Sequence, residues 1–191
     1  MTFGMDRVWA DLVKNRLEIR GMQHLLHEGP VLDIGCGASG FVLGTKSLYP
    51  ETLVVGIYFS EDSIKGAKKI SEFNRIYHEK YKGFELMLSS PYSLPFKNET
   101  FSLLHSLLLF YEYNIDRSPL LCNNVEKFIE ECYRVLKPGG LYIFAEGNNP
   151  PYEQTFLDKG FDYLEKDDNK FGSAILFQKP NKIIRSSAVL L

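Results

Sequence analysis

Residues 31–40, which read Val-Leu-Asp-Ile-Gly-Cys-Gly-Ala-Ser-Gly, constrain the fold of this chain more than any other segment. The first four residues are apolar except for Asp33, which is typical of a short buried strand. Gly35 and Gly37 allow the backbone to turn sharply and to approach a ligand, because glycine has no Cβ. A helix-like pattern begins at Phe41, and the amides of its first turn would point into the same crevice. This order of strand, glycine turn and helix is how an α/β protein receives an adenine-containing cofactor.

The spacing of the glycines does not by itself identify the ligand. Gly35, Gly37 and Gly40 satisfy the Gly-x-Gly-x-x-Gly pattern of dinucleotide-binding proteins. That fingerprint has its acidic residue well downstream, whereas Asp33 precedes the first glycine here. A glycine turn that binds no ligand is a further alternative, so residues elsewhere in the chain have to decide.

Composition narrows the class of protein. The chain has 191 residues, which is enough for one domain with its own core. Its formal net charge of −2 gives no electrostatic footprint for nucleic acid or an anionic membrane. The three cysteines, Cys36, Cys122 and Cys132, show neither metal-binding spacing nor a disulfide framework. With a charged amino terminus and no long apolar run, we expect a cytoplasmic protein without a metal site or membrane association.

Hydrophobic spacing and turn residues predict alternating helices and strands. We expect helices over residues 5–28 with a break near Gly21, 40–48, 60–77, 124–136 with Asn124 as its cap, and a short one ending at 159. We expect strands over residues 31–34, 53–58, 84–88, 101–108, 141–146 after a turn at 137–140, 161–164 and 174–178. This alternation predicts parallel strands joined by right-handed crossovers.

Segments beyond the glycine turn carry a family resemblance. The wording Leu-Asp-Ile-Gly-Cys-Gly resembles motif I of the class I S-adenosylmethionine-dependent methyltransferases. Further segments match the same family in order and spacing: residues 54–60, residues 89–96 with 101–102, and Arg-Val-Leu-Lys-Pro-Gly-Gly at 134–140. The resemblance covers roughly residues 28–179 and is closest to the small-molecule type.

The resemblance implies a fold and a division of the chain. The fold is α/β, a three-layer Rossmann-like methyltransferase fold whose seven-stranded sheet is mostly parallel with the last strand antiparallel. We expect a helical segment over residues 1–28, the methyltransferase-like domain over 29–180 and a tail over 181–191, which together make a single domain.

The resemblance also implies S-adenosylmethionine as the cofactor, held across the carboxyl ends of the first, second and fourth strands. Asp33, Gly35 and Gly37 would hold its methionine part, while Ser106 and Leu107 would approach it from the other side. The full set of expected cofactor-binding residues is Asp33, Gly35, Cys36, Gly37, Tyr58, Phe59, Ser90, Pro91, Tyr92, Ser106 and Leu107.

Two of these positions depart from the family pattern. Tyr58 stands where an acid normally takes the ribose hydroxyls, and Ser90 stands where an acid normally lies beside the adenine amino group. A carboxylate is a stronger acceptor than a hydroxyl. One lost bond of this kind costs about 1–3 kcal/mol, which corresponds to roughly ten- to hundredfold in affinity. Glu61 is an alternative ribose partner, or simply a charge at the start of its helix.

The sequence says less about the methyl acceptor than about the cofactor. Tyr111, Glu112 and Glu146 follow the fourth and fifth strands, where a general base would act, and each has an equally plain structural interpretation. His105 lies inside the fourth strand and is interpreted as a core histidine rather than a base. The tetrapeptide Asn-Pro-Pro-Tyr at 149–152 resembles the mark of nucleic-acid amino methyltransferases, but it follows strand five instead of strand four.

These observations favour methyl transfer from S-adenosylmethionine to a small-molecule acceptor, with no nucleic-acid partner. Because the chain has no long cap insertion, we expect an open acceptor site unless the N-terminal helix, a homodimer or a partner chain closes it. The alternative for the N-terminal helix is simple packing on the sheet edge. Tyr58 and Ser90 keep a second hypothesis open, in which a methyltransferase-like binding or accessory protein has a degenerate cofactor site. A third is that an altered site serves non-methyl chemistry.

Overall fold

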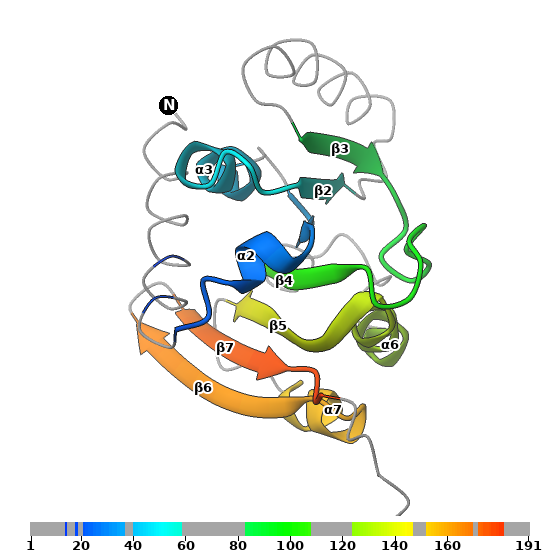
Figure 1. Ribbon diagram of the computed structural model, residues 1–191. Coiled ribbons are helices and arrows are strands. Elements are labelled where there is room, and N and C mark those ends of the chain that lie inside the picture. The colour runs from blue at the N-terminus through cyan, green and yellow to red at the C-terminus, as the bar shows by residue number, and fades with distance from the viewer. Residues whose placement is uncertain are drawn as a thin grey trace, which may run out of the picture.

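The computed structural model describes residues 14, 18, 21–36, 40–58, 83–107, 124–146, 152–169 and 172–181. Within these residues the helices are α2 (Leu25–Glu28), α3 (Gly40–Leu48), α6 (Val125–Val135) and α7 (Glu153–Asp158). The strands are β1 (Val31–Ile34), β2 (Val54–Tyr58), β3 (Phe84–Leu88), β4 (Phe101–Leu107), β5 (Leu136–Glu146), β6 (Asp162–Asn169) and β7 (Gly172–Gln178). Their arrangement is seen in Figure 1.

The strands form one seven-stranded sheet in the order β3-β2-β1-β4-β5-β7-β6 (Figure 1). β3, β2, β1, β4 and β5 pair in parallel, whereas β7 runs antiparallel to both β5 and β6. The strand order reverses direction between β1 and β4, which is the point where open α/β sheets bind their ligands. The predicted seven-stranded sheet with an antiparallel last strand is therefore confirmed.

Helices cover both faces of this sheet, which makes three layers. On one face, α6 and α7 bury Phe128, Ile129 and Phe156 in a core shared with alternate strand residues. On the other face, α2 and α3 contribute Leu25 and Val42 to a second core. We name these the α6–α7 face and the α2–α3 face. Because strand side chains alternate between faces, each central strand is apolar on both sides.

Several element bounds differ from the sequence prediction. β5 begins at Leu136 rather than at residue 141, because Leu136 pairs with Phe101 before the register shifts. Asn124 occupies the N-cap position of α6 but makes no side-chain cap bond. Gly21 has a left-handed φ of 64°, which confirms a break in the helical pattern there.

The β6–β7 hairpin is longer than predicted. β6 continues through charged residues 165–168, and it pairs with β7 up to the Asn169–Gly172 partners. Charged residues are common on edge strands, where they discourage pairing with other chains. A prediction from hydrophobic spacing does not detect such a strand, because the segment lacks apolar residues. The predicted helix over 60–77 lies outside the described residues. Among the residues that are described, no helix is long and apolar enough to cross a membrane.

Candidate cofactor site

The glycine turn leaves β1 at the carboxyl edge of the sheet. Gly35 has φ of 76°, a left-handed conformation that a residue with a Cβ adopts only under strain. The amides of Gly35 and Cys36 donate to the carbonyl of Ile57 at 3.0 Å and 2.9 Å, which ties the turn to β2. The chain then returns into α3 at Gly40. The predicted order of strand, turn and helix is confirmed, while Gly37 lies outside the described residues.

Gly56 on β2 allows this turn to lie close to the sheet. A Cβ built at Gly56 would stand 2.6 Å from Leu86, 3.0 Å from the Cβ of Cys36 and 3.0 Å from Val42. Such distances leave no room for a side chain, so the glycine sets the close approach of β2, the turn and α3. Cys36 is accordingly buried.

Asp33 lies beside His105 on the neighbouring strand. The two residues are register partners in the parallel β1–β4 pair, so their side chains emerge on the same face. The Nδ1 atom of His105 donates to Oδ1 of Asp33 at 2.8 Å, and both residues are buried. The ring of Phe41 stacks on the imidazole with centroids 3.7 Å apart. The interpretation of His105 as a core histidine with its hydrogen bond satisfied is confirmed.

The sequence analysis missed that this histidine has Asp33 as its partner. A usable signal was present, because the fourth strand is apolar around one ionisable residue and the first strand carries one acid. Deciding that they meet requires the register of the sheet, which a hydrophobic pattern does not give.

Tyr58 and the loop after β3 lie at the same edge. Tyr58 ends β2, is half-buried against the α2–α3 core, and accepts a bond from the amide of Ser89 at 3.1 Å through its carbonyl. Ser90 is exposed, and its hydroxyl accepts from the amide of Tyr92 at 3.3 Å. Pro91 is buried and Tyr92 is half-buried against the α6–α7 core. Both departures from the family pattern thus follow neighbouring strands.

Ser106 directs its hydroxyl into the protein. Its Oγ lies 2.8 Å from the hydroxyl of Tyr142 on β5, and Ser106 is fully buried. Tyr142 also hydrogen-bonds the thiol of Cys132 on α6, but burial is the larger influence and raises the pKa of that thiol well above its usual range. Cys132 therefore stays protonated and is no nucleophile. A contact between Ser106 and a cofactor would have to come from its backbone.

The remaining predicted site residues are only partly placed. Phe59, Tyr111 and Glu112 lie outside the described residues. Leu107 and Glu146 are the last residues of β4 and β5, and only their backbone is described. Because β5 ends at Glu146, the Asn-Pro-Pro-Tyr segment follows strand five, as the sequence predicted. In the part of the chain that the structure describes, no group of three acidic, histidine or cysteine side chains could hold a metal ion.

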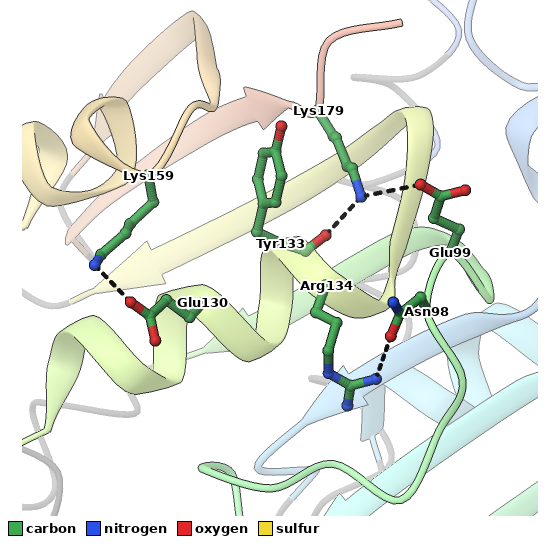
Figure 2. Close-up of a pocket in the computed structure, with 7 residues that line it drawn as sticks. All are labelled: Asn98, Glu99, Glu130, Tyr133, Arg134, Lys159 and Lys179. Carbon is green, nitrogen blue, oxygen red and sulfur yellow. Dashed lines mark hydrogen bonds and ion pairs between the residues drawn. The ribbon is translucent and has the colours of Figure 1, made fainter. Parts of the chain in front are cut away.

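A pocket of about 330 Å³ lies at the opposite edge, where the parallel strands begin. It is lined by Asn98, Glu99, Glu130, Tyr133, Arg134, Lys159 and Lys179. Figure 2 shows that its cations point at protein acceptors: Lys159 at Glu130, 2.7 Å away, and Arg134 at Asn98, 3.0 Å away. Lys179 donates to the carbonyl of Tyr133 at 2.9 Å. One ion pair and two hydrogen bonds to neutral groups thus use these cations within the protein, so we do not take this pocket as the functional site.

The side chains at the carboxyl edge fit S-adenosylmethionine by their chemistry. The buried carboxylate of Asp33 beside the turn suits a cationic group. The hydroxyl of Tyr58 can bond a ribose, and Pro91 and Tyr92 offer apolar surface after the neighbouring strand. The chemistry of these side chains is therefore compatible with the cofactor.

Comparison with known proteins agrees with this geometry. The sequence matches the family described as "Methyltransferase domain" over residues 32–144. It is 27% identical over 161 residues to the demethylmenaquinone methyltransferase of Lactococcus lactis subsp. lactis, covering 82% of this chain and 56% of that protein. The chain thus spans little more than half the length of this curated relative.

Solved structures share the fold. A SAM-dependent methyltransferase from Aquifex aeolicus aligns with a TM-score of 0.62 at 19% identity, over 87% of this chain and 88% of that one. The [4+2]-cyclase SpnF aligns with a TM-score of 0.63 at 16% identity, over 92% of this chain and 81% of that one.

The family match extends over more than half of the 191 residues. It begins in the strand before the glycine turn and ends within β5, so it contains the turn, the end of β2, the loop after β3 and the end of β4. The chain therefore belongs to the methyltransferase-domain family of class I S-adenosylmethionine-dependent methyltransferases.

Proposed function

We propose that this protein transfers a methyl group from S-adenosylmethionine to a small-molecule acceptor. The observation that carries the proposal is the buried acid of Asp33 immediately before a left-handed glycine turn, at the switch point of a sheet whose sequence matches the family. The Lactococcus relative, named for a quinone precursor, supports a small acceptor. When bound, the cofactor supplies a methyl group already activated by its sulfonium, so aligning the acceptor carries much of the rate.

The residues proposed to hold the cofactor follow the family pattern. Asp33, Gly35 and Gly37 would take the methionine part, and Tyr58 with Phe59 would take the ribose. Ser90, Pro91 and Tyr92 would enclose the adenine, while Ser106 and Leu107 would border the site through their backbone. For an acceptor that must lose a proton, the proposed bases are Tyr111 and Glu112, which follow β4 in the sequence, and Glu146, which ends β5.

Calorimetry of the purified protein tests the proposal. We expect heat of binding for S-adenosylmethionine or S-adenosylhomocysteine at ligand concentrations up to millimolar, weaker than in relatives with both carboxylates. Native mass spectrometry of the protein as purified should show the same nucleoside carried along. No binding of either ligand at millimolar concentration would refute the proposal.

A second candidate function rests on Tyr58, which ends β2 where an acid is usual. In that case the chain is a methyltransferase-like accessory protein, or its site serves non-methyl chemistry. The SpnF neighbour, named as a [4+2]-cyclase, supports considering chemistry other than methylation on this fold. A Tyr58→Asp variant separates the candidates. If the native chain binds neither nucleoside and the variant binds with micromolar affinity, the degenerate site is correct.

The organisation of the whole protein belongs to the same proposal. We take residues 1–28 as an N-terminal helical segment, 29–180 as the domain and 181–191 as a tail, and the acceptor site stays open unless the first part of that helical segment closes it. A homodimer or a partner chain would provide an alternative closure, and analytical ultracentrifugation with and without ligand would detect it. We also propose a cytoplasmic setting, because the spacing of the three cysteines shows no disulfide framework.

A further inference from the structure

His105 contacts both ends of the glycine turn. Asp33 precedes the turn and Phe41 follows it, and the imidazole touches both. The carboxylate bonds the edge of the ring at Nδ1, 2.8 Å away, while Phe41 covers one face of the ring at a centroid distance of 3.7 Å and an angle of 7°. Two contacts on different sides of one planar group leave it little freedom to rotate.

The residues around His105 on β4 indicate that this histidine does more than fill space in the core. β4 is a central strand, and its neighbours Leu103 and Leu104 are fully buried and apolar. An apolar residue at 105 would leave the carboxylate of Asp33 buried without the donor that it has now. A buried charge without a partner is costly. The histidine therefore satisfies Asp33 in the absence of a ligand.

We propose that His105 is a positioning residue for the cofactor site, which sets the orientation of the Asp33 carboxylate and the span of the glycine turn before ligand binds. The proposal rests on the proposed function, because the ligand whose binding it improves is S-adenosylmethionine. A carboxylate that is already fixed loses less conformational freedom on binding than one that must be ordered.

Two substitutions at this position separate the hydrogen bond from the stacking. His105→Phe keeps a ring against Phe41 and removes the donor to Asp33. His105→Asn removes the ring but keeps an amide hydrogen that can reach the carboxylate. We expect the Phe variant to bind S-adenosylhomocysteine about tenfold more weakly than the native chain, and the Asn variant to stay within about threefold.

The measurements are calorimetric affinity for S-adenosylhomocysteine together with urea unfolding of each variant. If His105 is merely structural, the loss of affinity in each variant should be proportional to its loss of stability. If His105 positions Asp33, affinity should fall only in the variant that lacks the hydrogen bond, whatever the stability of the two variants. Imidazole nitrogen spectra supply a second signature, because the Nδ1 resonance of His105 should move when ligand is added. The exposed His27 on α2 provides the control, since His27→Asn should change neither quantity.

The possible outcomes are distinct. If the native chain binds no nucleoside, the proposed function fails. If the native chain and both His105 variants bind equally well, the proposed function stands and the positioning role is overturned. Should the Phe variant fail to fold, an Asp33→Asn variant tests the same contact. Adding His105→Asn to it should then cause no further loss of affinity if the two residues act through one bond, and a full additional loss would overturn the proposal.

Discussion

Charged side chains that are half-buried or buried occur at both edges of the sheet, and their hydrogen bonds are arranged differently. At the edge where the parallel strands begin, the guanidinium of Arg134 bonds the carbonyls of Leu94 and Phe96 at 2.9 Å and 2.7 Å, and also both oxygens of Glu131. At the carboxyl edge, the bond that the described residues give the Asp33 side chain comes from His105 alone. The first arrangement is a closed network, whereas the second is a single hydrogen-bonded pair beside a turn.

This difference indicates that the bonds at one edge mainly stabilise the fold, whereas the pair at the other edge mainly shapes the proposed cofactor site. Arg134 and Lys179 join α6 to the loop before β4 and to the end of β7, so their bonds connect distant segments. Because the N–H groups of these two side chains already donate to protein acceptors, they are not available to bind a ligand. The Asp33–His105 pair joins adjacent strands that are already paired, so its distinctive effect is on the shape of the turn. Three substitutions test this division, beginning with the largest expected effect.

Removing Arg134 should affect stability and spare the cofactor site. Arg134→Met leaves Glu131 without its cation and two carbonyls without donors, so we expect a loss of about 2–3 kcal/mol in the free energy of unfolding. Urea unfolding measures the loss, and calorimetry should find the affinity for S-adenosylhomocysteine unchanged. Lys97→Met is the control, because it removes one positive charge from an exposed side chain in the same region. A parallel loss of affinity would break the comparison.

Replacing Gly35 should affect both stability and binding. Gly35→Ala places a Cβ on a residue with φ of 76°, which costs about 1–2 kcal/mol and distorts the turn. We expect roughly tenfold weaker nucleoside binding in calorimetry, since a shift of about 1.4 kcal/mol corresponds to that factor.

Gly21 offers a matched control for this substitution. Its φ is 64° and a Cβ added there meets nothing within 4 Å, so Gly21→Ala should carry a similar conformational cost. Its affinity for the nucleoside should nevertheless remain native. Equal affinity losses in the two variants would show that the turn has no special part in binding.

The smallest effect is a change in how stability depends on pH. The hydrogen bonds from Arg134 hold the pKa of Glu131 below its ordinary value of 4.5. A carboxyl with a depressed folded pKa contributes stability that is present above 4.5 and is lost as the pH falls through the folded value. Glu131→Gln should therefore cost about 1 kcal/mol at pH 7 and progressively less below pH 4.5.

Urea unfolding between pH 7 and pH 3 measures this convergence. The same substitution in an Arg134→Met background should show little dependence on pH, because the cation that lowers the pKa is gone. A pH-dependent difference that persists in that background would assign the effect to other charges around α6.

Much of the fold could be predicted from the chain itself. The acid and glycines of 33–40 and the apolar fourth strand are local signals, and each predicted the right element in the right order. The turn predicted at 137–140 is wrong, because these residues lie in β5. The misplaced bounds have local causes too. Leu136 joins β5 early because a neighbouring strand is available to pair with it, and the charged residues of β6 are held in a strand by β7.

The α/β class and the glycine turn could be predicted from the sequence, because both depend on residue type and on spacing along the chain. Three facts required the folded structure: His105 bonds Asp33, Ser106 bonds Tyr142, and Arg134 and Lys179 donate to carbonyl groups of the protein. The first two facts depend on sheet register and on the faces that strands present, whereas the bonds of Arg134 and Lys179 depend on how α6 packs against the loop before β4 and the end of β7. A one-residue change of register would move each side chain to the opposite face, and composition and periodicity do not fix that register.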